Sequence, residues 1–367
     1  MKQNELFYLL ALQKVRNVGD ISAKKLLRHF GTAEEIFKAA KEKAIDIPDV
    51  GSFIIDSIAK FKDFNRVENE MAYIEKNHIQ VTSIFDNDYP KKLFHAPDGP
   101  ILFFSKGNTN WNDRNIISIV GTRNITPYGK RMVEELIEGL KDYRPVIVSG
   151  LAYGVDIEAH LNALKHDLST FGVLGHGFQQ IYPSIHKRIS EDMLEKGGLI
   201  TEFWSSDIVD RNNFLKRNRI IAGLSEATII IESAAKGGSL VTADIANSYN
   251  RDVFAIPGRT SDKFSKGCNN LIKHNQAVIL TSHKDIVEML QWKTEEKQAA
   301  NKQLNLFVDL NKEEQKIFDY LQQNGKTSLD ELSFSLQMPI SKTAQILLGL
   351  ELNNVVSSLP GKAYEVI

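Results

Sequence analysis

Cysteine and long apolar runs are what this sequence has least of. It contains one cysteine, Cys268, in 367 residues, which excludes an intramolecular disulfide and argues against a structural zinc site. No uncharged run approaches the roughly 20 residues that span a bilayer. The apolar run Leu6–Leu12 follows Glu5 and has no small-residue cleavage site after it, so it predicts a buried helix rather than a signal peptide. We therefore expect a cytoplasmic protein without a membrane segment or a metal.

Net charge is also nearly absent. The 45 Lys and Arg residues almost balance the 46 Asp and Glu residues, which leaves a formal charge of −1. A nucleic-acid-binding protein with this balance must gather its cations on one face, because its bulk charge supplies no attraction. Hydrophobic residues make up 42% of the chain, which is ample for a core, and the length predicts two or three domains.

Changes in hydrophobic periodicity divide the chain into five segments. The predicted order is a helical domain, a connecting segment, a Rossmann-like α/β domain, a polar linker and a winged-helix domain, over residues 1–65, 66–114, 115–290, 291–310 and 311–367.

The first segment contains two possible helix–hairpin–helix motifs. Val15–Gly19 reads as a tight glycine turn between helices, and Ile47–Gly51 is a weaker copy. Such turns can present backbone N–H groups to a phosphate, although Asp49 in the second copy would repel one. A small helical bundle with glycine at its turns explains the same pattern, and both interpretations stay open.

The third segment predicts a doubly wound, mostly parallel sheet. Continuous apolar runs of strand length alternate with helical stretches, as expected for strands covered on both faces. Gly121, Gly150, Gly175 and Gly258 closely follow four of the runs, at the strand ends where open α/β sheets bind ligands. The runs are Ile116–Val120, Pro145–Val148, Phe171–Leu174, Leu199–Phe203, Thr228–Ile231, Val253–Ile256 and Val278–Leu280.

The last segment predicts three helices and a short hairpin, the order of a winged helix. Asn311 and Ser328 are spaced like N-caps from Glu314 and Glu331, and a third helix is expected over Ser341–Leu352. That helix has one cation, Lys342, whereas helices that read DNA usually present several basic or amide side chains. We therefore expect this domain to contribute little to DNA affinity.

Glycine turns and cations at the strand ends together predict a phosphate-binding groove. Glycine turns that open helices expose N–H donors, and Arg123 adds a cation able to bind a phosphate in bidentate fashion. Phe214 suits single-stranded nucleic acid, whose bases stack on rings, although it could equally be a core residue. The candidate DNA- or phosphate-binding residues are Gly121, Thr122, Arg123, Gly150, Gly154, Gly177, Lys187, Arg188, Phe214, Lys216, Arg217, Asn218, Arg219, Gly237, Gly238 and Ser239.

These blocks resemble the DprA/Smf family of DNA-processing proteins. The resemblance is dense from about residue 115 to 282 and rests on Gly121–Arg123, Ser149–Asp156, Arg217–Ser225, Gly237–Ala243, Val253–Gly258 and Gly267–Ile272. It implies a homodimer that binds incoming single-stranded DNA during natural transformation and hands it to the recombinase RecA. It also implies that Arg123 and Lys187 contact DNA, and that the protein is not an enzyme and has no cofactor. The family's Pro-Gly-rich stretch is replaced here by Trp204–Asp210, which leaves the shape of this loop open.

Two enzyme interpretations compete with DNA binding. A dinucleotide-dependent oxidoreductase would need a Gly-x-Gly-x-x-Gly turn, but Gly121 is followed by Thr122, Arg123 and Asn124. A nucleoside-monophosphate N-glycosidase of the lysine-decarboxylase-like group would need an acid/base glutamate where Thr242 stands, and this is the main alternative. The remaining candidates lack catalytic or metal-ligand spacing and are expected to be structural: Asp156, Glu202, Glu232, His160, His166, His176 and His186.

The linker contains one apolar island, Gln303–Phe307. It is similar to the Gln-Leu-x-Leu-Phe peptides that bind the DNA polymerase sliding clamp, and its polar surroundings would leave it free to bind. The alternative is that its apolar side chains attach the linker to a neighbouring domain.

Overall fold

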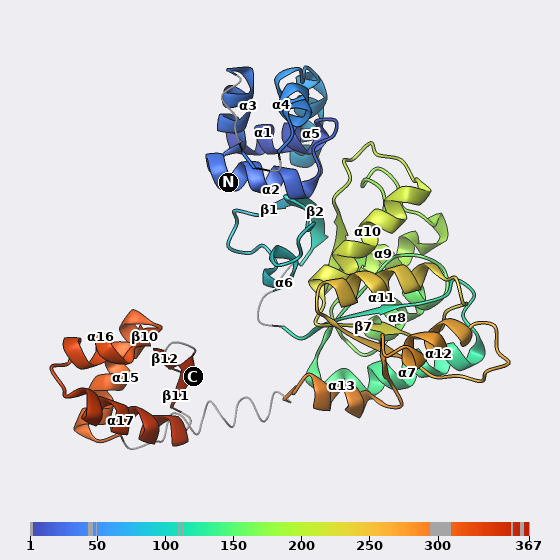
Figure 1. Ribbon diagram of the computed structural model, residues 1–367. Coiled ribbons are helices and arrows are strands. Elements are labelled where there is room, and N and C mark those ends of the chain that lie inside the picture. Colours follow the sequence, from blue (N-terminus) through green and yellow to red (C-terminus); the bar gives the residue numbers. More distant parts are fainter. Residues whose placement is uncertain are drawn as a thin grey trace. The chain divides into compact units, whose positions relative to one another are not determined.

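The computed structural model describes residues 3–42, 47–48, 50–108, 111, 114–293, 310–353, 355–359 and 363–366. The chain separates into two compact units, Met1–Trp292 and Lys293–Ile367 (Figure 1). Asp49 and the Gln303–Phe307 island lie outside the described residues, so the clamp hypothesis stays a prediction.

The first unit begins with a group of helices. Leu9, Leu10 and Leu12 are fully buried, which confirms the prediction of a buried helix over the first apolar run. The last of these helices runs on past residue 65 into the segment expected to be a connection. The helices are α1 (Gln3–Lys14), α2 (Asp20–Phe30), α3 (Ala33–Lys41), α4 (Ser52–Ala59) and α5 (Phe64–Lys76).

Two antiparallel strands follow where the sequence indicated only a connection. Strands β1 (Gln80–Ser83) and β2 (Leu102–Gly107) pair with each other, and helix α6 (Lys91–Phe94) lies between them in sequence. Strand β2 also pairs antiparallel with β6 (Gly198–Thr201). They extend the parallel sheet at one edge, so the connecting segment is part of the sheet.

The predicted parallel strands are all present, each within two residues of its expected bounds. The described sheet has the order β1-β2-β6-β5-β4-β3-β7-β8-β9, and the strands from β6 to β9 in that order are parallel. The chain moves outward from β3 to β6 and then returns to β7 beside β3. The parallel strands are β3 (Ile116–Val120), β4 (Val146–Ser149), β5 (Thr170–Val173), β6 (Gly198–Thr201), β7 (Ala227–Ile230), β8 (Asp252–Ala255) and β9 (Val278–Ile279).

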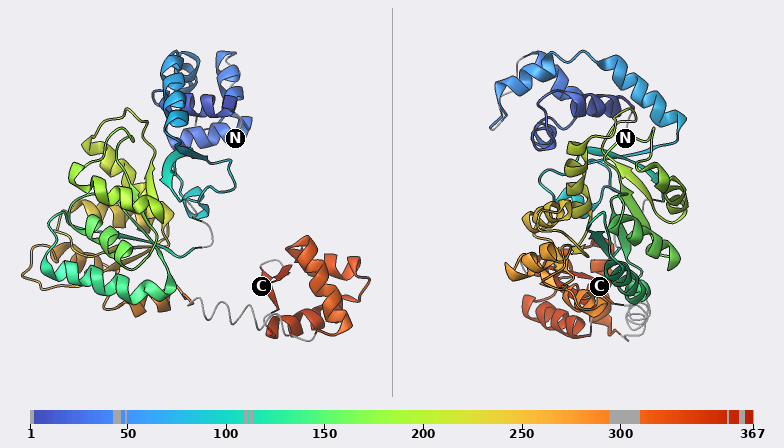
Figure 2. Two further views of the ribbon diagram at one scale, coloured as in Figure 1. Left: turned by 180° about the vertical axis from the view of Figure 1, so that it is seen from behind. Right: turned by 90° about the vertical axis from the view of Figure 1, so that its right-hand side faces the viewer.

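Helices cover both faces of this sheet (Figures 1 and 2). Alternate residues of β3 show the division: Ile117 and Ile119 pack with α7 (Pro127–Leu140), α8 (Val155–Lys165) and α13 (His283–Met289). Ile116 and Val120 pack with α10 (Arg211–Leu224), α11 (Gly238–Ser248) and α12 (Lys266–Lys273) on the other face. Cys268 is buried in the second layer. This domain also contains α9 (Lys187–Asp192) and short 3-10 turns at Lys141–Tyr143, Ser184–His186 and Met193–Glu195.

The second unit has the predicted winged-helix order. Asn311 and Glu314 form the expected capping box, and Ser328 accepts from the Glu331 amide. A small sheet of order β10-β12-β11 completes the domain. Its elements are α15 (Lys312–Asn324), β10 (Thr327–Ser328), α16 (Leu329–Ser335), α17 (Ile340–Leu352), β11 (Val356–Leu359) and β12 (Ala363–Val366). Among the described residues of the whole chain, no helix has the length and apolarity to cross a bilayer.

Candidate nucleic-acid interface

A groove lies at the point where the strand order reverses, between the carboxyl ends of β3 and β7. Open α/β sheets bind ligands at this position because the loops after the two strands diverge there. The groove has a volume of about 620 Å³. The predicted residues among those lining it are Gly121, Thr122, Arg123, Phe214, Arg217, Asn218, Gly237, Gly238 and Ser239.

Gly121 and Gly154 let two loops pack closely at the base of this groove. A Cβ on Gly121 would lie 2.5 Å from the Val155 side chain. Gly154 has a φ of +78°, and a Cβ there would collide with the Thr122 carbonyl. The Thr122 amide donates to the Glu232 carbonyl at 2.7 Å, so that amide is not open to a phosphate. The role of these glycines is therefore to bring Arg123 to the groove.

The start of α11 supplies open backbone donors instead. Gly237 occupies the N-cap position without a side-chain hydrogen bond, and a Cβ on Gly238 would meet nothing within 4 Å. The first amides of a helix have no intrahelical acceptors, and the helix dipole makes this end attractive to anions. Gly238 and Ser239, which both line the groove, can therefore present N–H groups to a phosphate.

Aromatic rings and guanidinium groups gather on one wall. The Cζ atoms of Arg123 and Arg217 lie 5.7 Å and 5.9 Å from the centre of the Phe214 ring, and the Tyr182 ring is 5.8 Å from it. Cations at this distance from a ring face are attracted to its quadrupole. A narrower pocket beside the groove is lined by the same four side chains together with Tyr153 and His176.

Arg217 is a buried cation. Only 5% of the residue is exposed, its guanidinium donates to the Val173 carbonyl, and its Nε has no partner. Burial lowers its pKa to about 10, and nearby Asp156 opposes the shift, so Arg217 stays charged at neutral pH. Burial also raises the pKa of Asp156, against the effect of Arg217. Gly150 makes room for both, because a Cβ there would collide with the Asp156 carboxylate and the guanidinium.

Several predicted residues lie elsewhere. Lys216 forms an ion pair with Glu202 at 3.2 Å, and Arg219 forms one with Asp20 at 3.0 Å, so neither side chain faces the groove. The reason is helical periodicity: positions 214 and 217 share one face of α10, whereas 216 and 219 share the opposite face. Contiguous cations in a sequence therefore do not make a contiguous cationic surface.

Three other predicted residues lie beside the groove rather than lining it. The Gly177 amide donates to the Asp207 carbonyl at 3.0 Å, so this N–H is occupied. Lys187 and Arg188 are exposed at the start of α9, directly after His186. The His186 ring lies 5.1 Å from Tyr153, which connects α9 to the narrower pocket.

Three of the cationic and aromatic residues that line the two pockets were not among the predicted binding residues. Arg211, Tyr153 and Tyr182 line the groove or the narrower pocket beside it, and the two tyrosines are 48% and 44% exposed. Arg211 precedes Phe214 by three positions, so helical spacing could have identified it. Tyr153 lies within the Ser149–Asp156 block, but the exposure of its ring and of the Tyr182 ring depends on contacts distant in the sequence.

The candidate catalytic groups are engaged in structural contacts. Thr242 is buried and lines the groove, and Glu232 accepts from the Thr126 amide at 2.9 Å and the Thr126 hydroxyl at 2.6 Å. The His160 ring lies between the Thr170 hydroxyl and the Gly150 carbonyl, 2.7 Å and 2.6 Å away. In the described part of the chain, no three His, Cys, Asp or Glu side chains gather in a way that could hold a metal.

Most of the first compact unit matches the model of one protein family. The family model described as DNA recombination-mediator protein A matches residues 80–291. The chain belongs to this family. A DprA winged helix domain model matches residues 306–362, and a helix-hairpin-helix motif model matches residues 8–70.

Relatives in this family cover most of the chain. Protein Smf of Synechocystis is 34% identical over 79% of this chain and 74% of its own length, and Protein Smf of Escherichia coli is 31% identical over 82% of each. The X-ray structure of DNA processing protein A from Streptococcus pneumoniae covers 80% of this chain and all of its own, with a TM-score of 0.66 and 30% identity. A structure of the Helicobacter pylori protein, described for its single-stranded DNA binding mode, covers 59% of this chain and 99% of its own, with a TM-score of 0.53 and 30% identity.

Proposed function

We propose that this protein binds single-stranded DNA in the switch-point groove during natural transformation, protects it and helps to load the RecA recombinase. The observation that carries the proposal is that the Phe214 ring lies 5.7 Å from the Arg123 Cζ and 5.9 Å from the Arg217 Cζ, in the lining of a groove that also contains the start of α11. Membership of the DNA recombination-mediator protein A family supports the same function.

The groove has the two components that single-stranded DNA requires. Arg123 and the first amides of α11 can bind phosphates, and the buried charge of Arg217 adds to the positive potential, while Phe214 and the exposed tyrosines Tyr153 and Tyr182 offer rings on which bases stack. Stacking on rings does not depend on base identity, so binding with little sequence preference is expected. The ring-lined wall also favours a strand with exposed bases over a duplex, whose bases are already stacked on each other.

The partners belong to the proposal as well. We infer that the protein acts as a homodimer and transfers its DNA to RecA, as the family relationship implies. The edge strand β9 is a suitable dimer contact, because Val278 and Ile279 are 40% and 46% exposed and the strand pairs only with β8 in the described sheet. We also propose that the protein acts without catalysis, since Thr242 takes the position where an N-glycosidase would need its carboxylate.

The test measures single-stranded DNA affinity as a function of salt. Arg123→Ala should weaken binding and reduce the slope of log K against log salt by about 0.7, the value for one lost phosphate contact on a single strand. Lys187→Ala, at the exposed start of α9, should do the same if the strand passes over this helix. Lys165→Ala removes another exposed cation, on α8, which pairs with Glu134, and serves as the control.

Two results would contradict the proposal. Unchanged affinity and salt slope in both Arg123→Ala and Lys187→Ala would exclude the groove as the DNA site. Release of free base from a nucleoside monophosphate by the wild-type protein would support the N-glycosidase interpretation instead.

A further inference from the structure

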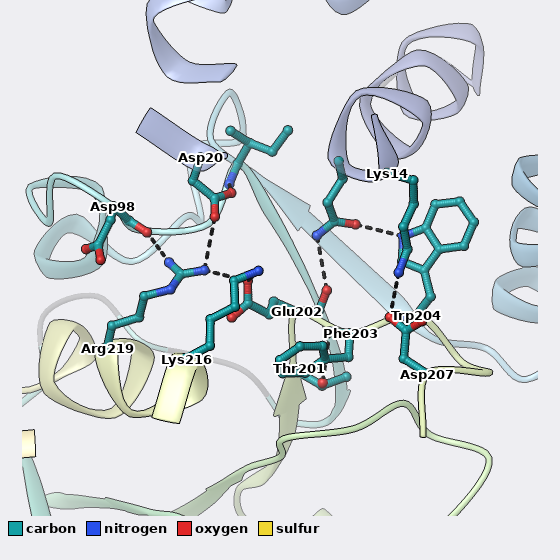
Figure 3. A network of polar contacts seen from close by, with 12 residues as sticks. Lys14, Asp20, Asp98, Thr201, Glu202, Phe203, Trp204, Asp207, Lys216 and Arg219 are labelled. Atoms are coloured by element: carbon teal, nitrogen blue, oxygen red, sulfur yellow. Dashed lines mark hydrogen bonds and ion pairs between the residues drawn. The ribbon is translucent and has the colours of Figure 1, made fainter. Parts of the chain in front are cut away.

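The loop that departs from the family pattern packs against the N-terminal helices. Trp204 is 1% exposed, and its indole N–H donates to the Gln13 side chain at 2.7 Å (Figure 3). The Lys14 ammonium lies 4.9 Å from the centre of the indole ring, and the Arg66 guanidinium lies 5.5 Å from it. A residue of the Rossmann-like domain is thus enclosed by side chains of α1 and α5. We call Trp204–Asp207 the latch segment.

Charged contacts hold the rest of the latch segment. Asp207 accepts from Lys14 at 2.5 Å and from Arg66 at 3.2 Å, and its side chain is only 18% exposed. The same carboxylate accepts from the Trp204 amide at 2.9 Å, so it also fixes its own loop. Glu70 of α5, itself buried, accepts from the Ser205 amide at 2.8 Å and from its hydroxyl at 2.6 Å. Removing one partner of such a part-buried ion pair leaves the charge of the other partner buried without a counter-charge, which destabilises the contact.

On its opposite side, the latch segment contacts the turn that lines the narrower pocket. The Asp207 carbonyl accepts from the Gly177 amide at 3.0 Å, and the Ser205 carbonyl accepts from the Gln179 amide at 3.3 Å. Gly177 has to be glycine for this contact, because a Cβ there would collide with the Trp204 carbonyl. The neighbouring residue His176 lines the narrower pocket together with Phe214. One loop therefore joins the N-terminal helices to the wall of the groove.

Helix α10 makes a second connection through its face away from the groove. Arg219 donates to Asp20 of α2 at 3.0 Å, to the Asp98 carbonyl and to Glu202 (Figure 3). Lys216 pairs with the same Glu202 at 3.2 Å. The other face of this helix carries Phe214 and Arg217. A displacement of one face of a rigid helix moves the other face as well.

We propose that Trp204 and Asp207 are positioning residues, through which docking of the N-terminal helices sets α10 and the 175–179 turn for single-stranded DNA. The inference rests on the proposed function. None of the groove-lining residues in the described part of the chain comes from α1 to α5, so the contacts through the latch segment and α10 give these helices an indirect route to the groove. Coupling between sites is reciprocal, so bound DNA should in turn strengthen the docking.

The Asp207→Asn substitution in the full chain distinguishes an effect of net charge from an effect of positioning, because the two change DNA affinity in opposite directions. Removing an anion would tighten DNA binding if only net charge mattered, because one repulsive charge is lost. Loss of positioning weakens binding instead, and we expect about a tenfold higher Kd, within the usual 5- to 150-fold range of coupling between sites. Trp204→Phe keeps the ring but removes the bond to Gln13, and should weaken binding in the same direction.

Two lysine substitutions distinguish the loss of the docking contact from the loss of a positive charge. Lys14→Met removes the ammonium that contacts Asp207, whereas Lys38→Met removes an exposed ammonium of α3 that pairs only with Glu34 and Glu35 of the same helix. Both variants lose one positive charge. Only Lys14→Met should raise the Kd, and equal effects of the two variants would overturn the inference.

Hydrogen exchange without DNA provides a readout independent of the proposed function. Asp207→Asn should accelerate amide exchange in α1 and α5 and also in the 175–179 turn and the first turns of α10, with α13 unchanged. Faster exchange confined to α1 and α5 would overturn the inference, even if the groove binds DNA. If the wild-type protein binds no DNA but exchange spreads as expected, the proposed function fails while the coupling stands. Should Asp207→Asn not fold, Lys14→Met is measured in the same way.

Discussion

At the scale of single residues, the buried side chain of His160 makes the stability of the protein depend on pH. It is fully buried, and burial lowers its pKa from 6.5 to about 4. The unfolded chain therefore binds more protons than the folded one between these two values, and stability is lost as the pH falls from 6.5 towards 4. The loss from this group is at most about 1.4 kcal/mol per pH unit. The Gly150 carbonyl accepts from Nε2 of the ring at 2.6 Å, so the added proton goes to Nδ1, which faces the Thr170 hydroxyl at 2.7 Å.

The measurement compares urea unfolding of the wild type and His160→Gln from pH 7 to pH 4.5. The wild type should lose stability relative to the variant as the pH falls below 6.5, since glutamine does not titrate. Other buried groups with shifted pKa values, such as Asp156 and His176, are common to both proteins and cancel in the difference. Parallel stability curves over this range would show that His160 is not the titrating group.

At the scale of elements, the edge strand β9 is the expected dimer contact. It lies at the end of the described sheet, so its outer N–H and C=O groups are open to pairing with another strand. Exposed Val278 and Ile279 would be buried when a second copy pairs with it. Ile279→Lys places a charge on this edge and should convert a dimer into a monomer, as measured by sedimentation or light scattering.

The control for this prediction is Leu161→Lys. Leu161 lies on α8 and is 42% exposed, close to the exposure of Ile279, and a lysine there should leave the dimer intact. A wild-type protein that is monomeric at micromolar concentration, or an Ile279→Lys variant that remains dimeric, would exclude β9 as the contact.

At the scale of the whole molecule, the winged-helix unit should be dispensable for DNA affinity. The one cation of α17, Lys342, forms an ion pair with Glu313 of its own unit, and the exposed face of α17 carries Ile340, Leu348 and Leu352. This surface suits a protein contact better than a nucleic acid. A chain that ends at Trp292 should bind single-stranded DNA with a Kd within about threefold of the full chain, which corresponds to about 0.7 kcal/mol. Loss of most of the affinity in the shortened chain would contradict this.

The sequence by itself determined the elements of this protein and the order in which they occur. Continuous apolar runs between helical stretches indicate parallel strands covered on both faces, and a glycine directly after such a run lies at the strand end. Helix caps are equally local, since the side chains of Asn311 and Glu314 each accept a hydrogen bond from the backbone amide of the other, within one helical turn. The strands and the winged-helix order were predictable for this reason. Strands β1 and β2 were not, because their pairing with each other and with β6 depends on partners far away in the chain.

Only the tertiary structure decided which side chains share a surface. Phe214, Arg217 and Arg219 are neighbours in sequence, yet the first two line the groove and the third joins Asp20, which lies 199 positions away. The sequence likewise left the structure of the loop around Trp204 open, and the contact of Trp204 with Gln13, 191 positions away, is seen only in the folded chain. Periodicity divides the faces of a helix, but it does not say what each face meets. That depends on which distant segment can complete the buried ion pairs and hydrogen bonds, and only the folded chain supplies it.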